Sequence, residues 1–182
     1  TETAYPTAAA LGRRARANGF APGDEFGNYR SVRELGEGGM GRVFEAEQSD
    51  TGRRVALKVL HAAAPTQSER DRFLREGRLA AAVSHPNSVF IFGVEQIGST
   101  QAIVMELVGG GTLKEQIAAN GPMQAAQACA VVMQLLDGLQ AAHAAGVLHR
   151  DIKPSNCFIE DDGQVKLGDF GISRPAQELG RT

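Results

Sequence analysis

The sequence predicts an α+β protein in which an antiparallel sheet of five strands with one helix precedes a mostly helical part. Two observations predict the sheet: strand-like segments alternate apolar and polar residues, and turn sequences rich in Gly, Asp and Ser separate them. The five predicted strands are residues 29–35, 42–48, 53–60, 89–96 and 101–108. Apolar residues at helical spacing predict one helix over 68–83, and two more, over 112–119 and 123–145, after the sheet.

The predicted helices have details that a structure can test. Ser68 begins the first helix, with Asp71 as its partner in a capping box. One face of this helix carries Phe73, Glu76, Ala80 and Val83. The long helix has one apolar stripe, which consists of Cys129, Val132, Leu136, Leu139 and His143. Two short strands are expected on either side of the turn at residues 161–163.

Composition narrows the classes of function. The 182 residues are 42% hydrophobic and 22% charged with a formal net charge of −2, so there is no general electrostatic reason to bind nucleic acid or an anionic membrane. No apolar run approaches the roughly 18 residues that span a bilayer, and no signal peptide is visible. Cys129 and Cys157 lack a CxxC partner. We therefore expect a reduced, cytoplasmic protein, with a membrane anchor outside this sequence left open.

The octet His149–Asn156 places three functional groups at a spacing that suits phosphoryl transfer. Asp151 can accept a hydroxyl proton, Lys153 can neutralise a transferring phosphate, and Asn156 offers a neutral oxygen to Mg²⁺. Pro154 excludes a regular helix or a central strand here, so irregular backbone displays the three side chains.

A glycine-rich turn at residues 36–41 fits the pattern G-x-G-x-x-G. A dinucleotide-binding fold needs a helix after the last glycine, and a Walker A loop needs Lys followed by Ser or Thr. Here a strand beginning Arg42-Val43 follows instead. A glycine hairpin remains, whose N–H groups can approach phosphates because no Cβ intervenes. A tight turn without a ligand is the alternative.

Lys58 lies among apolar residues in the third predicted strand, where an ammonium group is unfavourable unless it is paired. Glu76, on the apolar face of the first helix, is the obvious partner. Such an ion pair could aim the ammonium at phosphates. The alternative is a lysine that reaches solvent and a glutamate on an exposed helix face.

The octet resembles the catalytic loop of protein kinases, and its Lys153-Pro154 pair resembles the serine/threonine branch of that family. The likeness extends from Leu35 to Gly171. Residues 36–43 look like the kinase glycine-rich loop, Lys58 like its strand lysine, Glu76 like the glutamate of its helix C, and Asp169-Phe170-Gly171 like its metal-binding triplet.

The resemblance implies an ATP site. Its residues would be Leu35, Gly36, Glu37, Gly38, Gly39, Met40, Gly41, Val43, Ala56, Lys58, Met105, Glu106, Val108 and Phe158. Met105 is similar to the gatekeeper, while backbone groups of Glu106 and Val108 would bond the adenine edge. Three side chains, Val43, Ala56 and Phe158, would sandwich the adenine ring.

The resemblance also implies a metal site and a regulatory segment. Asn156 and Asp169 would hold Mg²⁺ at the phosphates. Arg150 would pair with an activation-segment phosphate, for which Ser173 and Thr182 are candidates. A stack of four side chains would regulate the site: Phe170, His149, Ile91 and Ala80.

The implied fold is that of a two-lobe protein kinase. Residues 1–27 are expected to be a flexible tail, 28–108 the small lobe and hinge, and 109–182 a partial large lobe that ends in the activation segment. A chain of this extent is expected to be inactive alone.

We expect ATP-dependent phosphoryl transfer to Ser or Thr hydroxyls of protein substrates, in the manner of bacterial serine/threonine kinases. The catalytic residues would be Asp151, Lys153, Lys58 and Glu76. Two other functions stay open: a small-molecule phosphotransferase of the antibiotic type, and a pseudokinase that acts as a nucleotide-binding module. A kinase dimer is a further open possibility.

Overall fold

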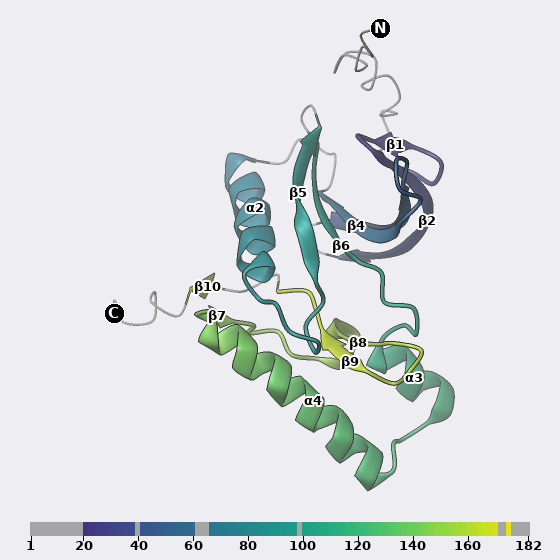
Figure 1. Cartoon of the computed structure of the whole chain (residues 1–182), viewed down its shortest axis with the longest axis vertical. Helices are drawn as coiled ribbons and strands as arrows, with labels where there is room; N and C mark the ends of the chain where they lie inside the picture. Colours follow the sequence, from purple (N-terminus) through teal and green to yellow (C-terminus); the bar gives the residue numbers. More distant parts are fainter. Residues whose placement is uncertain (1–19, 39–40, 61–65, 98–99, 171–173, 176–182) are drawn as a thin grey trace, which may run out of the picture. The chain divides into compact units, whose positions relative to one another are not determined.

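A computed structural model of the chain describes residues 20–38, 41–60, 66–97, 100–170 and 174–175 (Figure 1). These residues form two compact units. The first contains the described residues up to Leu74 together with Gly93–Leu107, and the second contains Arg75–Phe92 with the described residues from Val108 onward. The domain boundaries expected at residues 27 and 108 stay predictions.

A sheet of six strands, in the order β1-β2-β3-β4-β6-β5, dominates the first unit. Its strands are β1 (Glu25–Phe26), β2 (Tyr29–Gly38), β3 (Gly41–Gln48), β4 (Arg54–Leu60), β5 (Ile91–Ile97) and β6 (Thr100–Glu106). The pairings of β1 to β2, β2 to β3, β3 to β4 and β4 to β6 are antiparallel. The predicted count of five strands was wrong, because the two residues of β1 are too few to show an alternating pattern.

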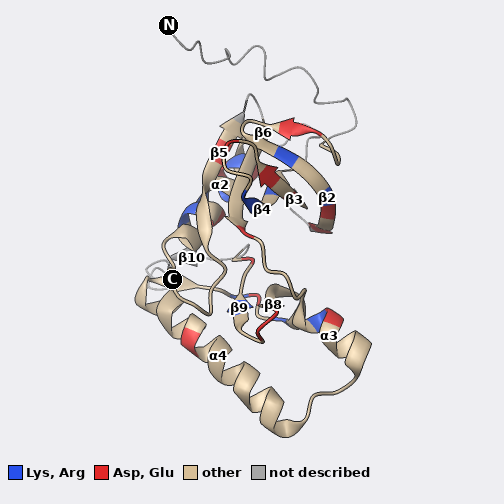
Figure 2. Ribbon diagram, turned by 45° about the vertical axis from the view of Figure 1, so that its right-hand side comes forward, with Lys and Arg blue, Asp and Glu red and all other residues tan. Residues whose placement is uncertain are grey.

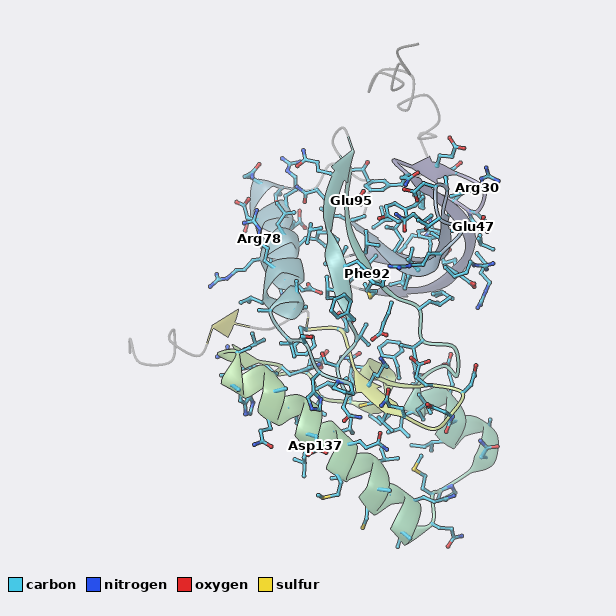
Figure 3. The ribbon with its side chains drawn as sticks, viewed as in Figure 1. Arg30, Glu47, Arg78, Phe92, Glu95 and Asp137 are labelled. Atoms are coloured by element: carbon cyan, nitrogen blue, oxygen red, sulfur yellow. The ribbon has the colours of Figure 1, made fainter. Side chains whose placement is uncertain are left out.

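The register of the sheet separates its two faces. Phe44 lies opposite Leu57, and Leu57 lies opposite Val104, so all three side chains share one face. This face forms a buried core, which consists of Phe26, Tyr29, Phe44, Ala46, Val55, Leu57, Val59, Ala102 and Val104. Residues offset by one position, beginning with Val43 and Lys58, must therefore lie on the other face. Arg30 on β2 lies opposite Glu47 on β3 (Figure 3).

Within the described residues, three helices accompany the strands: α2 (Gln67–Ala81), α3 (Leu113–Asn120) and α4 (Ala125–Ala144). The capping prediction for α2 was wrong by two residues. Thr66 Oγ1 accepts from the N–H of Glu69 at 3.3 Å, and the Glu69 carboxylate accepts from the N–H of Thr66 at 2.7 Å. These bonds make a capping box with the preferred Thr and Glu, whereas the predicted Asp side chain of Asp71 is shorter.

The apolar stripe predicted for α4 was wrong at four of its five residues, which are exposed, and right at Leu139, which packs against a core cluster. Val132 and Leu136 are each 51% exposed, and the buried residues are Leu135, Gly138 and Ala142. Asp137 is the only Lys, Arg, Asp or Glu in this helix (Figure 2), so apolarity alone could not identify its packed face. The packed face contains Gly138, where a larger residue would not fit, because a Cβ at this position would lie 2.4 Å from the carbonyl oxygen of Asn87. None of the helices in the described ranges is both long and apolar enough to cross a membrane.

Short strands and one 3-10 turn complete the second unit. They are β7 (Val147–Leu148), η1 (Pro154–Asn156), β8 (Cys157–Ile159), β9 (Val165–Leu167) and β10 (Arg174–Pro175). The strands β8 and β9 form the predicted hairpin around residues 161–163, and β10 pairs with β7. One core cluster packs this hairpin with residues of α3 and α4, and a second gathers the end of α2, the end of α4, β7 and Phe170.

Two glycines of the hairpin between β2 and β3 provide a matched test of packing. A Cβ at Gly41 would lie 2.2 Å from the carbonyl oxygen of Val59, whereas a Cβ at Gly36 would meet nothing within 4 Å. We expect Gly41→Ala to lower the free energy of unfolding by about 1–3 kcal/mol, because backbone must move. Gly36→Ala should change it by less than about 0.5 kcal/mol. Denaturant unfolding of the two full-length variants measures the difference, and equal stabilities would contradict this register.

Candidate active site

The octet forms a compact loop that brings the three predicted groups together. Lys153 Nζ lies 2.7 Å from Asp151 Oδ2. Asn156 Nδ2 donates to the carbonyl oxygen of Asp151 at 2.9 Å and to its Oδ2 at 3.1 Å. Pro154 begins the turn η1, as its fixed φ favours, and this turn carries Asn156 back toward Asp151.

The electrostatics of the loop keep Asp151 ionised. Its pKa lies below the ordinary value, first because Lys153 donates a hydrogen bond to the carboxylate and then because Asn156 does. A carboxylate with a lowered pKa is a weak base but a good acceptor for a hydroxyl group. The loop is therefore suited to orienting a hydroxyl and receiving its proton late in a reaction.

Two residues of this region have backbone conformations that non-glycine residues rarely adopt. Arg150, directly before Asp151, has φ 64°, and Asp169 has φ 57°. Such conformations cost about 1–3 kcal/mol each and persist where the surrounding structure holds them. In the sequence, these two strained positions lie on either side of Asp151, Lys153 and Asn156, and Asp169 is itself a candidate metal ligand.

His149 and Gly168 join the octet to the segment that carries Asp169. The N–H of Gly168 donates to the carbonyl oxygen of Asn156, and the Gly168 carbonyl lies 2.9 Å from His149 Nε2. Since Nδ1 of His149 accepts from the N–H of Asp151 at 3.2 Å, the ring proton resides on Nε2 and donates to Gly168. A Cβ at Gly168 would lie 2.8 Å from the side chains of Phe158 and Val89, so only glycine fits.

The oxygens of Asn156 and Asp169 suit a hard divalent cation. Because Nδ2 of Asn156 is engaged by Asp151, the amide oxygen Oδ1 is the atom that remains for a ligand. Asp169 is exposed and follows Gly168, the first residue after β9. No group of three or more His, Cys, Asp or Glu side chains that could hold a metal occurs among the described residues. A carboxylate and an amide suit Mg²⁺, which usually completes its shell with waters and phosphates.

The predicted stack behind this segment is confirmed. The rings of His149 and Phe170 have centroids 4.7 Å apart. Phe170, which is 2% exposed, shares a core cluster with Ala80, and Ile91 packs against that cluster. Gly171, Ser173 and Thr182 lie outside the described residues.

In the first unit, the sheet gathers the predicted nucleotide residues on one face. Val43 lies opposite Lys58, and Ala56 lies opposite Met105. These four side chains share the face opposite the apolar core, since they alternate with core residues. Gly36 pairs with Val43, Glu37 pairs with Arg42, and Leu35 lies at the irregularity of β2 beside Gly36. Gly39 and Met40 fall outside the described residues.

The remaining predicted residues are placed within their own units. Lys58 is 8% exposed and Glu76 is 5% exposed, so both charged groups are buried as expected. Their pairing stays a prediction. Glu106 ends β6 opposite Val55. Val108 and Phe158 are half-buried in the second unit.

A polar cluster that supports β9 could not be predicted from the sequence. Gln134 Oε1, on α4, accepts from the N–H of Val165 at 2.9 Å and from Asn87 Nδ2 at 3.1 Å. Asn87 Nδ2 also donates to the carbonyl of Val165 at 2.7 Å, and the Asn87 carbonyl accepts from Leu167 N–H. No pattern in the sequence distinguishes Asn87 or Gln134 from a surface residue.

Comparisons with known proteins agree with this geometry. Residues 29–181 match the family described as protein kinase domain, and the chain belongs to that family. A probable serine/threonine-protein kinase of Bifidobacterium longum is 40% identical over 156 residues, which are 84% of this chain and 21% of that protein. The serine/threonine-protein kinase PknA of Mycobacterium tuberculosis is 42% identical over 154 residues, which are 81% of this chain and 36% of that protein. The chain thus spans about a fifth to a third of these relatives.

The buried ring of His149 makes the stability of the folded protein depend on pH. Burial lowers its pKa from the ordinary 6.5, so the unfolded chain binds more protons than the folded one just below pH 6.5. The stability that the neutral ring contributes is complete above about pH 6.5 and is lost as pH falls toward the lowered pKa, by at most about 1.4 kcal/mol per pH unit.

We expect His149→Leu to remove this part of the slope when unfolding free energies are compared between pH 5 and 8. His143→Gln, at an exposed position on α4, is the matched control and should leave the slope as it is in the unaltered protein. Identical slopes in both variants would show that the buried ring is not the group that titrates.

Proposed function

We propose that this protein transfers the γ-phosphoryl group of ATP to Ser or Thr hydroxyls of protein substrates. The observation that carries the proposal is the cluster of Asp151, Lys153 and Asn156, joined through Gly168 to the segment bearing Asp169. The names of the two relatives, both serine/threonine-protein kinases, and the Lys153-Pro154 pair support the serine/threonine class of acceptor.

In this reaction Asp151 accepts a hydrogen bond from the substrate hydroxyl and takes its proton as the new oxygen–phosphorus bond forms. The bond to ADP breaks in the same displacement. Lys153, which now neutralises Asp151, has a long flexible stem and can place its ammonium on the transferring phosphoryl group. Because positioning dominates phosphoryl transfer, the backbone bonds around Gly168 matter as much as the charges.

The first unit would hold the nucleotide. Its face with Val43, Ala56 and Met105 supplies apolar area for the base, and Lys58 supplies a cation for phosphates. Gly36 has open space where a side chain would stand, which leaves room for a ligand. Glu76 would hold Lys58 in place.

Asn156 and Asp169 would hold Mg²⁺ through Oδ1 of the amide and the exposed carboxylate. When bound, this ion would neutralise the negative charge of the phosphates. The proposal of Mg²⁺ rests on the oxygen donors, because they are the ligands that this ion prefers.

Substitution of Asp151 tests the reaction. Asp151→Asn keeps the size of the side chain but cannot accept a proton, so we expect kcat of the full-length protein on a Ser- or Thr-containing substrate to fall roughly 10²–10⁴-fold. Asp137→Asn, on α4, is the matched control and should keep full activity; Figure 3 labels its position. Undiminished transfer by the Asp151 variant would overturn the assignment.

The metal ligands can be tested without measuring transfer. In Asp169→Asn, a neutral amide replaces the carboxylate, so nucleotide affinity measured against Mg²⁺ concentration should need roughly tenfold more metal to reach its maximum. Asp137→Asn again serves as the control. An unchanged metal requirement would remove Asp169 from the proposed site.

A further inference from the structure

A short segment before the matched family domain is attached to the sheet by its own hydrogen bonds. Phe20–Phe26 precedes residue 29, where the family match begins. Hydrogen bonds to Ser31, which is 2% exposed, hold the turn of this segment. Ser31 Oγ donates to the carbonyl of Ala21 at 2.6 Å, Gly23 N–H donates to the Ser31 carbonyl at 2.9 Å, and Ser31 N–H donates to the Asp24 carbonyl at 2.9 Å.

Phe20 extends this attachment toward the core of the sheet. Its ring packs edge-on against Phe44, with centroids 4.9 Å apart, and against Phe26 at 6.2 Å. Its carbonyl oxygen accepts a hydrogen bond of 2.7 Å from Arg42 Nη1. One residue outside the family domain therefore contacts β3 through both its ring and its backbone.

Arg42 connects this residue to the glycine-rich hairpin. It directly follows Gly41 on β3, and its Nε and Nη2 donate hydrogen bonds to the two carboxylate oxygens of Glu34 on β2. Its guanidinium carbon lies 4.9 Å from the centroid of the Phe44 ring. Arg42 thus joins both arms of the hairpin to the carbonyl of Phe20.

The charges within this group are mutually satisfied. The Arg42 guanidinium lowers the pKa of the Glu34 carboxyl, and a two-point Arg–carboxylate bond fixes direction as well as distance. The Arg42 and Glu34 side chains are 27% and 32% exposed, so water competes only partly with this bond. The two bonds to the Glu34 carboxylate and the third bond, to the carbonyl of Phe20, together specify a single position for the Arg42 guanidinium.

We propose that Phe20–Phe26 is a positioning element for the glycine-rich hairpin, so that nucleotide affinity depends on whether this segment is docked. The proposal rests on the nucleotide-binding role proposed above. Glycines lose more conformational freedom than other residues when a turn becomes fixed. An anchor at the base of a glycine hairpin reduces the freedom that remains to be lost when a ligand binds.

The test uses the full-length protein and three substitutions. Phe20→Ala removes the ring contacts, and Arg42→Gln removes the fork. We expect each to weaken binding of Mg-ADP about three- to tenfold, with kcat at saturating ATP changed less than KM. Both substitutions disrupt the same contact between Phe20 and Arg42. The Kd of the double variant for Mg-ADP should therefore be at most about twofold higher than that of the single variant that binds less tightly. Phe20→Leu, which keeps an apolar side chain, should restore most of the affinity.

Tyr29→Phe is the matched control. It removes a hydrogen bond of 2.9 Å to Glu95 from the same sheet without touching Arg42 or Phe20 (Figure 3 labels Glu95). It should lower thermal stability while leaving the nucleotide Kd unchanged. If Phe20→Ala lowers the melting temperature in the same way and also leaves Kd unchanged, the segment is only structural and the proposal is overturned.

Hydrogen exchange separates this proposal from the proposed function. Phe20→Ala should speed exchange of the amides of residues 36–38 and 41–44 in the absence of nucleotide, and Tyr29→Phe should not. Unchanged exchange in the Phe20 variant overturns the positioning role whether or not the protein binds nucleotide. If the unaltered protein fails to bind Mg-ADP, the nucleotide-binding role fails instead, and with it the dependence proposed here.

Discussion

The two backbone hydrogen bonds of Gly168 are the constraint on which the active-site region depends. Its N–H is held by the Asn156 carbonyl, and its carbonyl is held by the ring of His149. His149 in turn accepts from the N–H of Asp151. The loop that carries Asp151 and the segment that carries Asp169 are therefore fixed by the same few atoms, so a displacement of one displaces the other. A neutral, buried histidine can make both bonds at once, which an aliphatic side chain could not.

In the first unit a buried charged group, Lys58, lies on the same sheet as an apolar core. Strand alternation places the apolar core on one face, beginning with Phe44, and the predicted nucleotide residues on the other, beginning with Val43. At Gly41 the backbone of Val59 leaves no room for a side chain.

Much of this could be predicted because it depends on local sequence. The loop residues Asp151, Lys153 and Asn156 are close in sequence, and Pro154 determines the turn that folds them together. The features that could not be predicted depend on packing between distant segments. Exposed positions of α4 include the large apolar residues Val132 and Leu136, so residue type alone did not indicate the buried face, which the close approach of Gly138 to Asn87 identifies. The bonds that Gln134 and Phe20 make with distant residues likewise leave no signal in a periodic pattern.

The positive φ angles of Arg150 and Asp169 limit what could replace these two residues without cost. Glycine would adopt either conformation without steric cost, and asparagine would adopt it more readily than most residues. Exchange of either residue for glycine would therefore relieve backbone strain, but it would also remove a guanidinium at position 150 or a carboxylate at position 169.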